Sequence, residues 1–176
     1  METGILLCGL NGAGKSTLGR ALAKELHFHY IDNEDLYFPK TDPQYTYAAP
    51  RSREEVEALL LETINVHRDF VFTSVKGDYG PEVRARFHWA VLISVPRDIR
   101  LNRVRQRSFQ RFGPRMLPGG DLYEAEENFF KFVEGRPEGT VEEWARTLTC
   151  PIIRVDGTRP IEENVRYIAE QIRNGR

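Results

Sequence analysis

The sequence of 176 residues holds little cysteine and histidine, with two and four residues respectively. Two cysteines are too few for a disulfide framework or a structural zinc site, and the histidines have no metal-ligand spacing. We therefore expect Cys8 and Cys150, which both lie in apolar stretches, to be reduced and buried. Stability has to come from an ordinary hydrophobic core, which a chain of this length can bury.

An excess of one charge and long hydrophobic runs are also missing. The 25 basic and 26 acidic side chains give a formal net charge of −1, so no overall field attracts nucleic acid or an anionic membrane. The longest apolar run, residues 89–95, is too short to cross a bilayer, and residues 1–10 lack the basic flank of an export signal. These absences predict a cytoplasmic protein that binds no membrane.

No repeat, linker or change in composition divides the chain, which predicts one domain over residues 1–176. Short apolar or β-branched runs alternate with amphipathic stretches, as in a parallel sheet covered by helices. The expected strands are residues 5–8, 28–31, 70–75, 91–95 and 152–155.

Helices are expected between these strands. The first, residues 15–26, has apolar residues on one face, and the second begins at Ser52 and Glu55, which have the spacing of a capping box. A third should run from about residue 96 to the Gly113-Pro114 break, and the last should begin near residue 160. The inward-facing residues expected in that last helix are Ile161, Val165, Ile168 and Ile172.

One motif carries chemistry that the composition does not reveal. Residues 9–16, GLNGAGKS, match the phosphate-loop pattern G-x-x-x-x-G-K-[ST] between an expected strand and an expected helix. Its glycines let backbone N–H groups turn toward one anion, and the new helix adds the positive end of its dipole. The expected nucleotide-binding residues of this loop are Gly9, Asn11, Gly12, Ala13, Gly14, Lys15, Ser16 and Thr17.

Three side chains of this motif have separate expected tasks. Lys15 should reach the β and γ phosphates of the nucleotide, Ser16 should ligate Mg²⁺, and Thr17 should contact the α phosphate. No expected strand ends in Asp-Glu, as in remodelling ATPases and recombinases, and no N-K-x-D sequence selects guanine. A small phosphotransferase that uses ATP and Mg²⁺ remains.

The residues that follow the motif carry a family resemblance. The run GAGKSTLGRALAKELHFHYIDNED resembles the opening of the shikimate kinase and gluconate kinase branch of the nucleoside-monophosphate-kinase-like superfamily. Weaker similarity continues through the arginine-rich segment to CPIIRVDGTRPIEENV and covers most of the chain. The resemblance implies a three-layer α/β P-loop NTPase fold, with a five-stranded parallel sheet of order 2-3-1-4-5 and helices on both faces. It also implies a mobile, helical, arginine-rich lid at about residues 103–135, and an acceptor-binding region after the second strand.

In that family a D-x-D motif ends the second strand. Asp32 matches its first aspartate, at the edge of the sheet where ligands gather, and could hold Mg²⁺ through water. The second aspartate falls on Glu34, with Asp35 following, and either could accept the proton of an acceptor hydroxyl. The alternative is that Asp32 or Asn33 caps a short helix.

Arginines accumulate in the expected lid. Arg103, Arg107 and Arg111 are spaced four residues apart and would share one helix face. The sequence NRVRQR is similar to the lid entrance of nucleoside monophosphate kinases, where the first arginine stacks on adenine and the second contacts the transferring phosphoryl group. The resemblance thus implies a nucleotide contact for Arg103 and a catalytic role for Arg107, and we expect one for Arg111. One alternative is a solvated, salt-bridged helix. Another is an RNA-binding helix, but the near-zero net charge argues against RNA binding.

The acceptor region is marked by aromatic and basic residues. Four tyrosines and a phenylalanine could stack on a planar acceptor or could pack a loop, namely Tyr30, Tyr37, Tyr45, Tyr47 and Phe38. Arg51 and Arg53 weakly resemble the site that holds the acceptor carboxylate in shikimate kinase, but Pro50 replaces the phenylalanine of that site, so a genuine shikimate kinase is not expected. Further expected acceptor contacts are Lys76 and Gly77, with Arg84 or Arg86 for a phosphorylated acceptor.

The sequence thus predicts a kinase that uses ATP and Mg²⁺ to transfer the γ-phosphoryl group to a hydroxyl of a small-molecule acceptor. The expected catalytic residues are Lys15, Asp32, Arg107 and Arg111, with Ser16 and Asp32 at the metal. The alternatives are a nucleoside monophosphate kinase and, outside enzymes, a nucleotide-binding regulator with slow hydrolysis.

Overall fold

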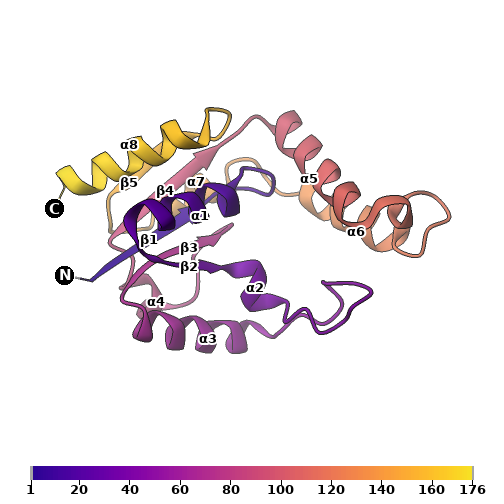
Figure 1. Cartoon of the computed structure of the whole chain (residues 1–176), viewed down its shortest axis with the longest axis horizontal. Helices are drawn as coiled ribbons and strands as arrows, with labels where there is room; N and C mark the ends of the chain where they lie inside the picture. Colours follow the sequence, from indigo (N-terminus) through magenta and orange to yellow (C-terminus); the bar gives the residue numbers. More distant parts are fainter. Residues whose placement is uncertain (1, 176) are drawn as a thin grey trace.

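The computed structural model of the protein describes residues 2–175, and its centre is an all-parallel, five-stranded sheet. The strands are β1 (Thr3–Cys8), β2 (His29–Asp32), β3 (Asp69–Ser74), β4 (Trp89–Ser94) and β5 (Ile152–Asp156). Their order across the sheet is β2-β3-β1-β4-β5, as expected, and each observed boundary lies within two residues of the expected one (Figure 1). The expected fold class is therefore confirmed.

The central strand β1 is apolar over most of its length because neighbours cover it on all sides. It pairs in parallel with β3, where Leu6 faces Phe72, and with β4, where Leu6 faces Ala90. All six of its residues are buried. Strands covered on both faces lose the alternation of polar and apolar residues that half-exposed strands show.

Helices cover both faces of the sheet (Figure 1). α1 (Lys15–Leu26) and α8 (Ile161–Asn174) pack on the face that holds Ile5 and Leu7 of β1. α3 (Arg53–Val66), α4 (Pro81–Arg84) and α7 (Thr140–Ala145) pack on the opposite face, with Leu6 and Cys8. Successive residues of a strand point to opposite faces, so β1 contributes alternately to two apolar layers.

The lid projects from the sheet as a separate pair of helices (Figure 1). α5 (Arg97–Phe112) leads through a 3₁₀ turn, η1 (Gly113–Met116), to α6 (Tyr123–Glu134). The two helices share a small apolar cluster of their own, formed by Val104, Met116, Phe130 and Val133. The helical lid is therefore present, and the Gly113-Pro114 sequence ends α5 as expected.

Two further local expectations are confirmed at helix starts. Ser52 and Glu55 form a complete capping box at the start of α3. A short helix, α2 (Asn33–Tyr37), follows β2 directly, and Asp32 caps it. The segment from residue 38 to 52 then passes below the lid and returns to α3 (Figure 1).

Two expectations about burial are wrong. Ile161 is exposed because it occupies the first turn of α8, before the part of the helix that packs on the sheet at Val165 and Ile168. Cys150 is only half-buried because it lies in the turn before β5, at the rim of an apolar layer, whereas Cys8 is fully buried. Within residues 2–175, no helix is long and apolar enough to pass through a membrane.

Candidate active site

The phosphate loop connects β1 to α1 with the backbone shape that its glycines predict. Gly12 and Gly14 have φ angles of 81° and 91°, in the left-handed region that favours glycine. A Cβ atom on Gly12 would also lie 2.3 Å from the carbonyl oxygen of Arg100 in α5. The loop is thus shaped both by its own dihedral angles and by the close approach of the lid helix.

Lys15 is the cation of this loop. Its Nζ donates a hydrogen bond to the carbonyl oxygen of Leu10, 3.1 Å away. Burial of the ammonium group, and then repulsion from Arg107, lower the pKa of Lys15 to about 8. Both causes disfavour the charged form in the free protein, and a bound polyphosphate would oppose them.

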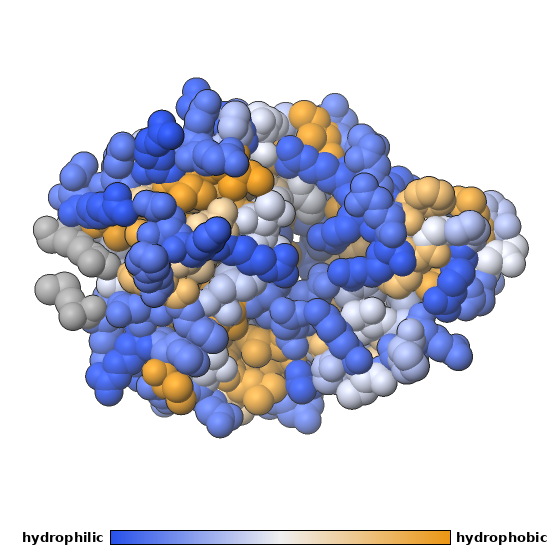
Figure 2. Space-filling model, viewed as in Figure 1, coloured by the Kyte–Doolittle hydropathy of each residue, from blue (hydrophilic) through white to orange (hydrophobic). Residues whose placement is uncertain are grey.

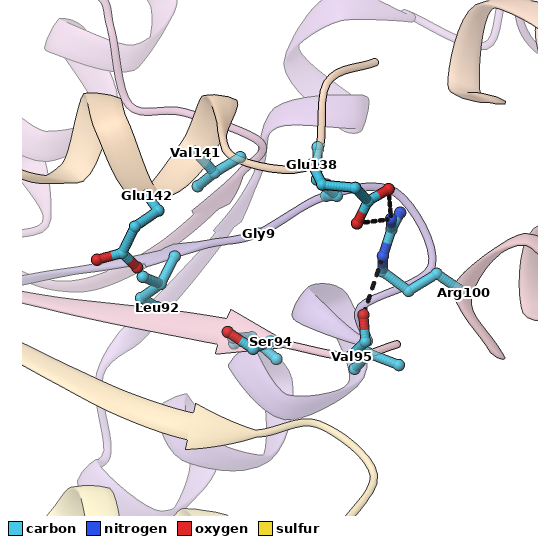
Figure 3. Close-up of a pocket in the computed structure, with 10 residues that line it drawn as sticks. Gly9, Leu92, Ser94, Val95, Arg100, Glu138, Val141 and Glu142 are labelled. Atoms are coloured by element: carbon cyan, nitrogen blue, oxygen red, sulfur yellow. Dashed lines mark hydrogen bonds and ion pairs between the residues drawn. The ribbon is translucent and has the colours of Figure 1, made fainter. Parts of the chain in front are cut away.

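A buried arginine that the sequence analysis did not single out supports the loop from behind (Figure 3). The side chain of Arg100 is only 4% exposed. Its guanidinium donates to the carbonyl oxygens of Val95 (3.2 Å) and Asn11 (3.1 Å), and to both carboxylate oxygens of Glu138 (2.6 and 2.8 Å). Arg100 therefore joins the phosphate loop to the end of β4 and to the segment between α6 and α7.

The main cavity of about 820 Å³ lies between the phosphate loop, the carboxyl ends of β2 and β3, and the lid. Figure 2 shows a hollow between the body and the lid, with hydrophilic residues on both sides. Ligands of open parallel sheets bind at this edge. The expected site residues that line the cavity are Asn11, Gly12, Lys15, Ser16, Asp32, Glu34, Lys76 and Arg107.

Asp32 both caps α2 and lines the cavity. Its Oδ1 accepts from the backbone N–H of Glu34 (3.0 Å), and its Oδ2 accepts from the Tyr30 hydroxyl (2.7 Å). Ser16 also interacts with the Tyr30 hydroxyl, whose pKa is raised, chiefly by burial. Ser16 and Asp32, the two expected metal residues, are therefore linked through one tyrosine.

Glu34 and Asp35 are separated by the turn of α2. Glu34 lines the cavity, where its Oε1 accepts from the Tyr47 hydroxyl (3.2 Å) and lies 3.5 Å from Arg111. Asp35 does not line the cavity and pairs with Lys40 at the surface. Neighbouring residues of a helix point in different directions, so only one of the two can face the site. Asp35 therefore lies outside the cavity, and its expected acceptor contact stays a prediction.

The three lid arginines have different surroundings. Arg107 lines the cavity, and no carboxylate within residues 2–175 pairs with it. Arg103 donates to the carbonyl oxygens of Gly12 (3.4 Å) and Gly157 (3.2 Å), between the phosphate loop and the turn after β5. Arg111 contacts Tyr47 and Glu34 and does not line the cavity, so it joins the lid to the acceptor segment.

On the acceptor side, two residues with expected contacts, Arg51 and Gly77, lie outside the cavity. Arg51 donates to the carbonyl oxygen of Leu36 (2.7 Å) outside the cavity, and Arg53 lines the cavity instead. Gly77 fills a packing role, because a Cβ atom there would lie 2.9 Å from Leu6 and from Phe87. The suggested phosphate contacts Arg84 and Arg86 also lie elsewhere, bonded to Thr147 and to Asn65.

The sequence analysis missed the residues that α6 and its end contribute to the cavity, namely Phe129, Phe132 and Arg136. The guanidinium of Arg136 lies 4.6 Å from the ring centroid of Phe132, and burial lowers its pKa. No carboxylate among the described residues pairs with it. In the sequence, Arg136 is a lone arginine between Gly135 and Pro137 in an acidic stretch, and no motif marks it. Only the fold brings it to the site.

A family model described as an AAA domain matches residues 5–111, from β1 to α5. The chain belongs to this AAA domain family. The chain is 27% identical to the uncharacterized protein YqaC of Bacillus subtilis, over 98% of each chain. It is also 34% identical to a shikimate kinase of Bacteroides fragilis, over 42% of its own length and 43% of that protein.

Among solved structures, the chain is similar to the shikimate kinase of Acinetobacter baumannii in complex with shikimate. The TM-score is 0.60 at 16% identity, with 100% of this chain and 96% of that chain covered. The chain has the fold of a gluconokinase of Sinorhizobium meliloti and a shikimate kinase of Aquifex aeolicus, and the expected resemblance to P-loop kinases of this kind agrees with these relatives. The expectation of a phosphotransferase that uses a nucleotide agrees with these relatives, which are kinases.

Proposed function

We propose that the protein is an ATP- and Mg²⁺-dependent kinase that transfers the γ-phosphoryl group to a hydroxyl of a small-molecule acceptor. One observation carries this proposal: a single cavity contains the phosphate loop, the lid cation Arg107 and the acceptor-side residues Glu34 and Lys76. Phosphoryl transfer needs little covalent chemistry from a protein and depends on positioned cations. The cavity supplies such cations between the proposed sites of ATP and of the acceptor.

The donor set fits a magnesium ion. Ser16 offers a hydroxyl oxygen and Asp32 a carboxylate, the oxygen ligands that Mg²⁺ prefers, and Tyr30 contacts both side chains. Asp32 already accepts one hydrogen bond on each oxygen, which leaves lone pairs for a metal-bound water. When bound, Mg²⁺ would neutralise charge on the β and γ phosphates, while Lys15 and Arg107 hold the transferring group.

Glu34 is the proposed acceptor of the proton. Glu34 lines the cavity, and Tyr47 and Arg111 contact only one of its oxygens, Oε1. By contrast, both oxygens of Asp32 accept hydrogen bonds, Asp35 lies outside the cavity, and Asp78, which also lines it, is paired with Arg53. In the reaction the acceptor oxygen bonds to the γ phosphorus, and the bond from that phosphorus to the bridging oxygen breaks. ADP leaves, and the hydroxyl proton passes to Glu34.

A nucleoside monophosphate kinase is the second candidate, and the unpaired cations of the acceptor side favour it. Lys76 and Arg136 line the cavity, and no carboxylate within residues 2–175 pairs with either. They could hold an acceptor that is itself a phosphate, in addition to the cations needed for ATP.

The test is ATP-dependent phosphorylation of a broad panel of hydroxyl and phosphate acceptors in the presence of Mg²⁺, followed by mass spectrometry. We expect acceptor-dependent release of ADP, and its loss in Lys15→Ala, whose circular dichroism spectrum should match the native one because the backbone shapes the loop. Tight ATP binding without any product would instead indicate a nucleotide-binding regulator. Undiminished turnover in Lys15→Ala would remove Lys15 from its role.

A further inference from the structure

The acceptor side of the main cavity is aromatic on two opposing walls. Tyr37, Phe38, Tyr45 and Tyr47 come from α2 and the segment after it, and Phe129 and Phe132 come from α6 in the lid. Some of these rings also pack on each other, as Phe38 and Tyr47 do with their centroids 4.9 Å apart. The same aromatic residues therefore pack on each other and line the cavity.

The tyrosine hydroxyls of these walls already donate to protein groups. The hydroxyl of Tyr45 donates to Glu126 (2.9 Å), and that of Tyr47 donates to Glu34 (3.2 Å). Tyr79, which follows β3, donates to the side-chain oxygen of Asn33. A phenol has one proton to donate, so these residues offer an acceptor their rings more than their hydroxyl protons.

Several other polar groups nearby are engaged as well. Each oxygen of Asp32 accepts a hydrogen bond, and the side-chain oxygen of Asn33 accepts from Tyr79. Glu34 is held by Tyr47 and Arg111. Lys76 and Arg136, by contrast, line the cavity and pair with no carboxylate among the described residues. These two cations fit an anionic group on the acceptor.

Phe132 and Arg136 form the rim where an acceptor would enter. The Phe132 ring is 57% exposed at the edge of the cavity, and large exposed aromatic residues at a pocket often mark a binding surface. The Arg136 guanidinium lies against this ring and is half-buried, without a carboxylate partner among the described residues. An anion on the acceptor would neutralise it.

From this arrangement we infer that the acceptor carries a flat, aromatic ring and an anionic group. The ring would lie between the tyrosine segment and Phe132, with the anion at Arg136 and Lys76. This inference rests on the proposed kinase function and names the chemical class of its acceptor.

The first experiment is calorimetric titration of the ADP-saturated, Mg²⁺-loaded protein, because saturation keeps the probes out of the ATP site. The ringed probes are cytidine and guanosine 5′-monophosphates, and their ring-free match is ribose 5-phosphate. We expect at least one ringed probe to bind about tenfold or more tightly than ribose 5-phosphate, since stacking of a base on an aromatic side chain gives such a factor. Equal affinities, or tighter binding of gluconate or shikimate, would overturn the inference.

A matched pair of variants locates the effect. Phe132→Leu keeps an apolar side chain but removes the ring, so it should weaken binding of the ringed probe and leave ribose 5-phosphate unchanged. Phe109→Leu is the control, because Phe109 is also exposed on the lid but lies outside the cavity. An undiminished preference for the ringed probe in Phe132→Leu would contradict the assigned position of the ring.

The two proposals fail in different ways. If the protein binds no ADP in the presence of Mg²⁺, both the proposed kinase function and the inferred acceptor class are wrong. A protein that binds ADP and phosphorylates gluconate or shikimate, but shows no preference for the ringed probes, would keep the kinase function and lose only the acceptor class.

Discussion

Lys15 and Arg107 approach the same part of the cavity as two cations without a salt-bridge partner among residues 2–175. Each therefore raises the free energy of the other's charged form, and the free protein stores a positive potential where polyphosphate is expected. Burial of the ammonium group, and then this repulsion from Arg107, lower the pKa of Lys15.

Nucleotide binding should therefore take up a proton at Lys15. With a pKa of about 8, roughly half of the Lys15 side chains are neutral at a pH of about 8, and a bound polyphosphate favours the ammonium form. We expect proton uptake when ADP binds at that pH and little at about pH 6.5, measured by calorimetry in buffers of different ionisation enthalpy.

Lys15→Ala is the control for this prediction, and it should abolish the uptake. The lowered pKa also has a consequence for stability, because the unfolded chain keeps a proton that the folded protein releases above a pH of about 8. The contribution of Lys15 to the free energy of unfolding should therefore rise from about pH 8 to the ordinary lysine pKa. Equal proton uptake by the variant would assign the titration to another group.

Arg107→Ala should lower turnover more than it lowers nucleotide affinity. Its unpaired guanidinium can strengthen its contact as charge develops on the transferring phosphoryl group, and loss of such an arginine reduces kcat by about 10³-fold or more. Steady-state kinetics and ADP titration separate the two effects. Arg105→Ala is the matched control on the same helix, because Arg105 pairs with Glu127 and Glu134 on the outside. A loss confined to nucleotide binding would demote Arg107 to a ground-state contact.

At the scale of elements, the phosphate loop depends on α5 as much as on its own motif. Arg100 of α5 bonds the Asn11 carbonyl, and the backbone of α5 fits against the hydrogen atoms of Gly12. Glu138 then connects Arg100 to the segment that carries Arg136. The buried guanidinium of Arg100 thus connects, through hydrogen bonds, the nucleotide side of the cavity to its acceptor side.

Arg100→Met should lower the free energy of unfolding by about 1–3 kcal/mol, because it removes the donor from two carbonyl groups. It should also weaken ADP binding. Arg97→Met provides the control, since Arg97 is exposed and lies 3.6 Å from the same Glu138, and its loss should change stability by less than about 0.5 kcal/mol. Urea denaturation and ADP titration measure both, and equal effects in the two variants would refute the role of Arg100.

A second relation between elements joins the lid to the acceptor segment. Tyr45 bonds the buried Glu126 of α6, and its ring centroid lies 5.5 Å from that of Phe112 at the end of α5. Arg115 donates to the carbonyl oxygen of Gln44 (2.9 Å). The lid and the acceptor segment therefore enclose the cavity together.

At the scale of the whole molecule, Cys8 reports on the integrity of the sheet. It lies in the central strand between β3 and β4, and burial raises the pKa of its thiol to about 12. A thiolate-selective reagent should therefore label half-buried Cys150 first, and should reach Cys8 only when the molecule unfolds globally. Mass spectrometry of labelled peptides, followed against urea, distinguishes the two sites. Labelling of Cys8 as fast as Cys150 would mean that the central strand opens locally.

Much of the fold could be predicted because it follows from short stretches of sequence. The apolar run before residue 9 predicts a buried strand, Ser52 and Glu55 predict a helix start, and Gly113 and Pro114 predict a helix end. The phosphate loop is equally local, because two glycines with positive φ and a following helix start determine its shape. In each case the interacting groups lie within a few residues of one another.

Side-chain direction and long-range neighbours were beyond such reasoning. Adjacent residues looked equivalent, yet Glu34 faces the cavity and Asp35 faces solvent, while Arg53 lines the site and Arg51 does not. Arg136 reaches the cavity only because α6 returns along α5, more than a hundred residues after the phosphate loop. The sequence by itself determined the strands, the loop and the first lid helix through local patterns, while the family resemblance implied the strand order and the rest of the lid. Only the tertiary structure decided which charges meet in one cavity and which are neutralised elsewhere, because packing between distant segments sets burial and charge pairing.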